Sequence, residues 1–183
     1  MATPSRVQLL AADIWDTPDD ENRYEIIDGD LYLTPPPSLA HQHAVSELLL
    51  TLRSFAKGHD LGEVYVAPLG VILDPTTGVQ PDLVFISRGR LEIMKDQGLE
   101  GAPDLAVEVL SPSTASRDRG IKMRRYAASG IEHYWIVDPR NRTLEAYRLG
   151  ANGFDSIVSL GQDDLFTPEL FPGLAINLSE LWR

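Results

Sequence analysis

The chain has 183 residues, enough for one domain with its own core, and its 43% hydrophobic and 23% charged residues are ordinary globular values. It contains no cysteine, which excludes disulfides and thiolate metal sites. Its formal net charge of −11 argues against a general nucleic-acid binder, because such proteins gain affinity from cationic side chains.

The sequence also carries expectations about location and domain organisation. It has no apolar run of roughly eighteen residues, so we expect no membrane-spanning helix. The polar residues 1–6 have no long apolar stretch behind them, so we expect no signal peptide, and with the missing cysteines this predicts a cytoplasmic protein. We expect a single domain over residues 1–183, with a core at about 7–150 and a C-terminal tail, 151–183, that packs on it.

The N-terminal half predicts a β-hairpin followed by a long helix. Residues 23–27 and 30–33 have strand composition, and the Asp28-Gly29 pair between them is a strong signal for a tight turn. Prolines at 35–37 end the second strand. Residues 38–57 then place apolar side chains at helical spacing.

The remaining pattern alternates strands with one further helix. The nearly all-apolar run at 104–110 is typical of a central strand. Hydroxyl residues near 111–114 favour a helix start, and that helix is expected to end at Gly130. Further strands are expected at 63–67, 70–73, after Asp82, and at 132–138, 143–148 and 156–160. The predicted fold class is α/β (α+β), a mixed β-sheet flanked by two main helices.

Two carboxylates interrupt apolar strand segments. Asp82 begins one such run, and Glu108 lies between two valines in another. A buried carboxylate is costly unless it is paired or bound to a metal. Glu108 therefore needs a partner, and Lys122, Arg124 or a metal would each serve. Asp82 also fits an ordinary turn residue, and Lys122 a solvated cation on a helix face.

Hard oxygen ligands suit magnesium, which is typically held by one or two carboxylates with water and phosphate oxygens. Asp82 and Glu108 are candidate ligands of Mg²⁺ or Mn²⁺, and the backbone carbonyl of Val109 is a candidate third. Lys122 would place a fixed positive charge near the attacking water or the phosphate. His41 and His43 do not share a helix face, so we expect no joint zinc site.

Six short motifs resemble those of a known family. In chain order they are Tyr24-Glu25-Ile26-Ile27-Asp28-Gly29-Asp30-Leu31, Pro36-Pro37 before His41-Gln42, Pro81-Asp82, Val107-Glu108-Val109-Leu110-Ser111-Pro112-Ser113, Lys122 with Tyr126 and Gly130, and Tyr134-Trp135-Ile136-Val137-Asp138-Pro139. Their order resembles the Uma-type restriction endonuclease family of the PD-(D/E)XK nuclease superfamily. The resemblance covers about residues 7–150.

This resemblance implies a restriction-endonuclease-like core with a divalent metal at the edge of the sheet. By position, Asp82 matches the first metal-binding acid, Glu108 the second, and Glu25 an acid of the hairpin that joins the same pocket. Lys122 matches the lysine, although the superfamily usually has it two residues after the second acid, where this chain has Leu110. His41 matches a position at the start of the first helix.

The expected function is cleavage of phosphodiester bonds in nucleic acid, with DNA the expected substrate and a homodimer plausible from the fold resemblance. Two alternatives stay open at this point. One is a binding or assembly protein that keeps the nuclease fold without activity, which the acidic net charge favours. The other is action on a small nucleotide or a structured nucleic acid.

Overall fold

The computed structural model describes residues 8–182, and its elements follow the predicted order closely. The strands are β1 (Arg23–Ile27), β2 (Asp30–Thr34), β3 (Gly62–Val66), β4 (Gly70–Asp74), β5 (Thr77–Val79), β6 (Leu83–Ser87), β7 (Gly98–Glu100), β8 (Leu105–Val109), β9 (His133–Asp138), β10 (Thr143–Gly150), β11 (Gly153–Gly161), β12 (Leu165–Phe166) and β13 (Ile176–Asn177). The helices are α1 (Leu39–Gly58), α2 (Ala115–Arg117) and α3 (Met123–Ala128), with short 3₁₀ segments at Ala11–Asp16, Arg88–Ile93 and Leu178–Trp182.

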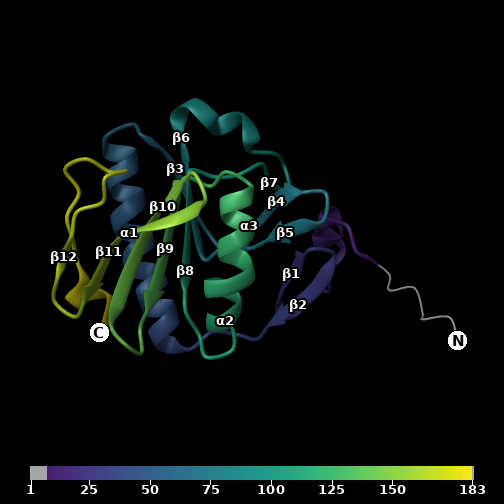
Figure 1. The fold of residues 1–183 in the computed structure, drawn as a ribbon, viewed down its shortest axis with the longest axis horizontal. Coiled ribbons are helices and arrows are strands. Elements are labelled where there is room, and N and C mark those ends of the chain that lie inside the picture. The colour runs from purple at the N-terminus through teal and green to yellow at the C-terminus, as the bar shows by residue number, and fades with distance from the viewer. Residues whose placement is uncertain (1–7, 183) are drawn as a thin grey trace, which may run out of the picture.

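A six-stranded mixed sheet forms the centre of the molecule, in the order β11-β10-β9-β8-β6-β3. The strand β8 lies inside this sheet, between β6 and β9, which confirms the central position predicted from its apolar composition. Figure 1 shows α1 on one side of the sheet and α2 and α3 on the other. The predicted α/β class, with a mixed sheet flanked by helices, is therefore confirmed.

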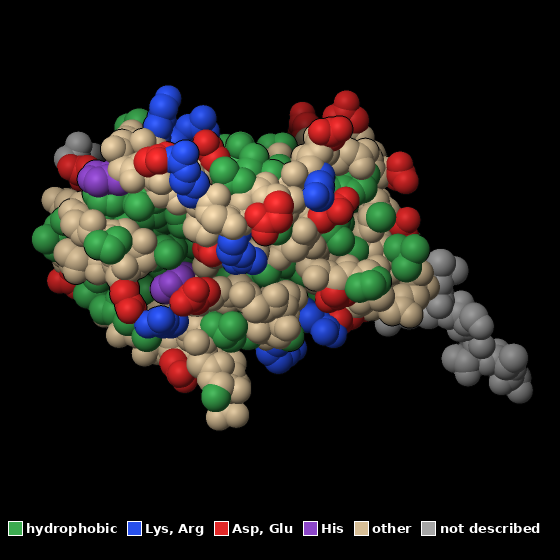
Figure 2. Space-filling model, turned by 90° about the horizontal axis from the view of Figure 1, so that it is seen from above, with side chains coloured by type: hydrophobic (Ala, Val, Ile, Leu, Met, Phe, Trp, Pro, Cys, Tyr) green, Lys and Arg blue, Asp and Glu red, His purple; other side chains and the backbone are tan. Residues whose placement is uncertain are grey.

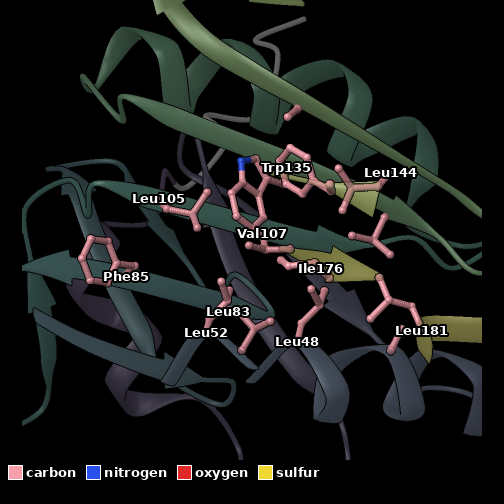
Figure 3. Packing of buried hydrophobic residues seen from close by; sticks show 14 of the residues in the cluster. Leu48, Leu52, Leu83, Phe85, Leu105, Val107, Trp135, Leu144, Ile176 and Leu181 are labelled. Atoms are coloured by element: carbon pink, nitrogen blue, oxygen red, sulfur yellow. The ribbon is translucent and has the colours of Figure 1, made fainter. Parts of the chain in front are cut away.

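Alternation along the central strands divides the core into two layers. Leu105, Val107 and Val109 of β8 pack in the cluster that contains the apolar face of α1. Figure 3 shows Leu105 and Val107 in that cluster, in a view that also labels Leu48 and Leu52 of α1. The even-numbered Ala106 packs in the other cluster, with side chains from α3 and from β4, β5 and β7. Glu108 has the same parity as Ala106 and therefore points toward this second layer.

The predicted hairpin β1–β2 is present, and Asp28 takes a positive φ of 57° in its turn. It does not extend the central sheet, however. It is one end of a separate five-stranded sheet, in the order β2-β1-β5-β4-β7. The sequence predicts a single mixed sheet because β5 and β7 have only three residues each, too few to show an alternating pattern.

The chain crosses from one sheet to the other at Gln80-Pro81-Asp82, between β5 and β6. This crossing places Asp82 at the start of a central strand, beside β1 of the second sheet. The backbone carbonyl of Asp82 accepts from the amide of Ala67, and Gln80 donates to Glu25 on β1 at 2.9 Å. Residues from both sheets thus meet at one place.

The second predicted helix, about 111–129, is shorter and less regular than expected. It begins at Ala115, and a π-helical segment, Asp118–Lys122, separates α2 from α3. Such segments are often found at functional sites. Asp118 and Lys122 are both buried here, so the irregular turn directs two charged side chains inward.

The C-terminal residues contribute to the first core layer. Phe171, Ile176, Leu178 and Leu181 are nearly inaccessible and belong to the same cluster as α1 and β8. Figure 3 shows Ile176 and Leu181 in this layer. No helix within residues 8–182 is long and apolar enough to cross a membrane.

Candidate active site

Four of the predicted site residues come together in one buried cluster. Glu25 comes from β1, Asp82 from the crossing before β6, and Glu108 from β8. Lys122 comes from the π-helical segment. All four are at most 2% exposed. Charged groups are rarely buried this completely without partners, so their contacts decide what the cluster does.

Asp82 is held by three groups. Its Oδ1 accepts a hydrogen bond from Arg23 Nη1 at 2.6 Å. Its Oδ2 accepts from the backbone amide of Val109 at 2.7 Å and lies 3.3 Å from His41 Nε2. Burial raises the pKa of Asp82, but hydrogen bonds and positive charge from His41 and Arg23 together lower it by more, so the pKa lies well below its usual value. Asp82 is therefore an anion at neutral pH.

Lys122 joins the carboxylates of three elements. Its Nζ lies 2.6 Å from Glu108 Oε1, 2.8 Å from Glu25 Oε1 and 3.7 Å from Asp118 Oδ1. Burial alone would lower the pKa of this ammonium, but the neighbouring carboxylates raise it well above its usual range. Lys122 stays charged and is the counter-ion of the cluster. Lys122, in the π-helical segment after β8, thus reaches back to Glu108 on that strand.

Of the three carboxylates Glu25, Asp82 and Glu108, Glu108 binds a proton most readily. Its Oε1 also accepts from the hydroxyl of Tyr126 at 2.6 Å. Burial raises its pKa, Lys122 opposes that rise, and the negative charges of Asp118, Asp82 and Glu25 add to it, so that the pKa reaches about 8. A carboxylate crowded by like charges in this way favours either a proton or an added cation.

Glu25 has one satisfied oxygen and one unsatisfied oxygen. Its Oε1 accepts from the amide of Gln80 and from Lys122, whereas its buried Oε2 has no hydrogen-bond partner. Arg117 Nη2 lies 3.7 Å from that oxygen and donates to Thr34 Oγ1. Burial raises the pKa of Glu25, but the positive charges of Lys122, Arg23 and Arg117 have the larger effect, so the pKa lies below its usual value of 4.5. Glu25 is therefore ionised.

A pocket of about 620 Å³ opens beside the cluster. Asp82, Arg23, His41 and Gln80 line it, and Glu25, Glu108 and Lys122 do not. The cluster consequently meets solvent at Asp82. The other acids and the lysine lie behind that residue, in the protein interior.

The donor set fits a hard divalent cation in chemistry and charge, since carboxylate oxygens are the preferred ligands of Mg²⁺ and Mn²⁺. The unpartnered Oε2 of Glu25 and the raised pKa of Glu108 both favour added positive charge. In this conformation, however, no three His, Cys, Asp or Glu side chains among residues 8–182 are placed to hold a metal. Arg23 and Lys122 supply the positive charge instead.

Of the two side chains considered as partners of Glu108, Lys122 contacts it, whereas Arg124 is exposed. It places His41 against Asp82, while His43 bonds the backbone carbonyl of Glu180. Val109 contacts the site through its amide nitrogen, so its carbonyl as a metal ligand stays a prediction.

Sequence reasoning missed four charged or polar residues of the cluster. They are Arg23, Arg117, Asp118 and Tyr126. Three of them have a local signal in the sequence. Arg23 is two residues before Glu25 on a strand and so shares its face, and Asp118 is one helical turn before Lys122. Tyr126 is one helical turn after Lys122 and stands with it in one of the six motifs, whereas Arg117 depends on the tertiary packing and carries no such local signal.

The fold matches that of a solved structure described as "a putative nuclease belonging to DUF820" from Anabaena variabilis. The TM-score is 0.78 at 19% sequence identity, and the match covers 95% of this chain and 97% of the other. At this identity the likeness shows a shared fold. The class that fold and cluster define is an α/β protein with a mixed sheet flanked by helices and with acids and a lysine buried together.

The chain itself belongs to the family described as "Uma2: Putative restriction endonuclease", whose model matches residues 11–179. The match includes all five predicted catalytic residues and most of the tail, which the sequence motifs alone did not cover. No curated protein matches. The family supports a nuclease and, with it, a nucleic-acid substrate and the general use of divalent metals.

Proposed function

We propose that this protein is an endonuclease that hydrolyses phosphodiester bonds in nucleic acid, DNA in the first place, with Mg²⁺ or Mn²⁺ as cofactor. The observation that carries the proposal is the buried cluster of Glu25, Asp82, Glu108 and Lys122, which meets a pocket at Asp82. A fold does not need three acids and a lysine buried together, because such groups cost stability.

Each residue has a proposed role. Asp82 and Glu108, with the carbonyl of Val109, would hold the cation, and Glu25 adds negative charge to the same site. A divalent cation bound there lowers the pKa of a water molecule and neutralises charge on the scissile phosphate. Lys122 balances and positions Glu25 and Glu108, which it contacts directly. His41 orients Asp82 from the pocket side.

Arg23 must release Asp82 before that carboxylate can bind a cation, since it now contacts Oδ1. The freed guanidinium remains at the pocket, where it is placed to contact a phosphate oxygen. Arg23 thus has two successive partners in this proposal, the carboxylate first and the substrate afterwards.

The test is cleavage of supercoiled plasmid and of labelled oligonucleotides in Mn²⁺ or Mg²⁺. We expect the wild type to cut, and we expect Asp82→Asn and Glu108→Gln to lose at least about a hundredfold in rate, as for removal of a charge-stabilising group. Asp60→Asn is the matched control, because Asp60 is an exposed acid whose ion pair is with the exposed Arg88. Equal activity of Asp82→Asn and Asp60→Asn would overturn the assignment.

One observation favours a second candidate, a binding or assembly protein that has lost activity. All three acids already have side-chain cations as partners, as they would in a purely structural cluster. This candidate predicts no cleavage with either metal and a clear loss of thermal stability in Asp82→Asn. The homodimer and the cytoplasmic location stay predictions, which sedimentation and cell fractionation would test.

A further inference from the structure

The pocket beside Asp82 is walled by four separate segments of the chain. They are residues 17–24, residues 34–38 with the start of α1, residues 66–68, and residues 111–114, and a fifth segment with Gln80 and Asp82 completes the lining. Its volume of about 620 Å³ lies in the range of sites that enclose one small molecule, about 300–1,000 Å³. Of the described residues that line it, Arg23 is the only Lys or Arg.

Several hydrogen-bonding groups at this pocket have no partner within the protein. Arg23 gives Nη1 to Asp82, but its Nε is buried and unpaired. His41 is 6% exposed, has Nε2 against Asp82, and leaves Nδ1 buried and unpaired. Nδ1 is therefore a further hydrogen-bonding atom at the pocket that has no partner among the described residues.

The N-terminus of α1 faces the same space. This helix has 20 residues, and Ser38, His41 and Gln42 of its cap and first turn line the pocket. Ser38 Oγ satisfies the amide of His41, and the first intrahelical bond is made by the amide of Gln42. The amides of residues 39 and 40 precede both of these bonds at the helix N-terminus, and they favour an anion together with the positive end of the helix dipole. The N-terminus of α1, the guanidinium of Arg23 and the imidazole of His41 thus lie at the same pocket.

We propose that this pocket binds the phosphate of a single unpaired nucleotide, so that the preferred substrate is single-stranded nucleic acid or a strand end rather than continuous duplex. The inference rests on the proposed function for its meaning as a substrate site. The binding itself needs only the donors described above.

The walls and rim of the pocket select for one nucleotide. Pro35, Pro36 and Pro37 give one wall an apolar surface against which a base can lie. Exposed Asp19, Asp20 and Glu21 lie among the lining residues and repel further phosphates. A duplex brings many phosphates and needs several cations to neutralise them. Figure 2 shows a face on which Lys and Arg stand singly or in small groups among Asp and Glu.

The first experiment measures binding without any metal, so that cleavage plays no part. Thymidine 5′-monophosphate is titrated by calorimetry, followed by competition between an eight-nucleotide single strand and a dumbbell duplex of the same sequence. Non-nucleotide linkers close both ends of this dumbbell, so it has no strand end and no unpaired base. We expect the nucleotide to bind, and the single strand to compete at a concentration at least tenfold below that of the duplex. No nucleotide binding, or equal competition by the duplex, would overturn the proposal.

Two variants locate the site. Arg23→Gln should weaken nucleotide binding at least tenfold, but it also removes a partner of Asp82 and can disturb folding. Gln42→Glu avoids this difficulty, because residue 42 is exposed and an acid in the first turn of a helix stabilises it. That variant should weaken binding at least fivefold. Leu50→Glu adds the same charge at an exposed position of α1 outside the pocket and should leave binding unchanged. Equal binding by both glutamate variants would refute the location.

The two proposals fail in different ways. If the nucleotide binds and Gln42→Glu weakens it while no substrate is cut in Mn²⁺, the pocket stands and the endonuclease proposal fails. If the enzyme cuts the dumbbell duplex as fast as the single strand, the endonuclease proposal stands and the choice of unpaired substrate fails.

Discussion

Replacing Lys122 with methionine removes the ammonium group that joins three buried carboxylates while keeping a side chain of similar length. Lys122 and Glu25 are fully inaccessible, and their charged atoms lie 2.8 Å apart. Removing one partner of such a pair leaves an uncompensated buried charge and costs about 3–5 kcal/mol. For a chain of this length, that lowers the melting temperature by roughly 10 °C.

The pH dependence of this loss follows from Glu25. Its pKa is lowered in the folded protein, so it contributes stability above its unfolded value of 4.5, and that contribution is lost as pH falls through the folded value. Without Lys122 the pKa of Glu25 rises, and the contribution shrinks. The difference between wild type and Lys122→Met should therefore be largest at neutral pH and smaller near pH 4.

Urea unfolding followed by tryptophan fluorescence measures both effects, since Trp135 is buried in the core. Arg119→Met is the matched control. It breaks a partly exposed pair with Glu145, for which we expect a loss below about 1 kcal/mol. If Lys122→Met costs no more than this control at pH 7, the cluster is not held together by its lysine, and the reasoning is wrong.

Two further predictions test other parts of the structure. The pKa of Glu108 is raised from 4.5 to about 8, so wild-type stability should fall as pH rises through that interval, by at most about 1.4 kcal/mol per pH unit. Glu108→Gln should lose this slope in urea unfolding, and an unchanged slope would contradict the shift. Phe171→Ala should cost about 3–5 kcal/mol, because its buried ring lies 4.8 Å from Phe85. Leu165→Ala, at an exposed position of the same tail, should change stability by less than about 0.5 kcal/mol. Equal losses in Phe171→Ala and Leu165→Ala would show that the packing of the tail on the core does not stabilise the fold.

Local patterns in the sequence predict the parts of the fold that local physics determines. The Asp28-Gly29 turn specifies the hairpin, and the spacing of Ala44, Leu48 and Leu52 specifies α1. The apolar run around Glu108 predicts a central strand and a carboxylate in need of a partner. Each of these features depends on residues close together in the chain.

The remaining parts depend on tertiary contacts. The second sheet is assembled from three-residue strands, and the π-helical turn forms where Asp118 and Lys122 both have to point inward. Asp82 pairs with Arg23, which lies 59 residues earlier in the chain. No short window of sequence contains that pair. It becomes visible only once the crossing between the sheets is known.

The most direct test of the central claim is a calorimetric titration with Mn²⁺, made with and without thymidine 5′-monophosphate to complete the metal's ligands. We expect saturable Mn²⁺ binding to the wild type and to Asp60→Asn, and loss of this binding in Asp82→Asn. Absence of binding by the wild type even with the nucleotide, or undiminished binding by Asp82→Asn, would contradict the proposed metal site.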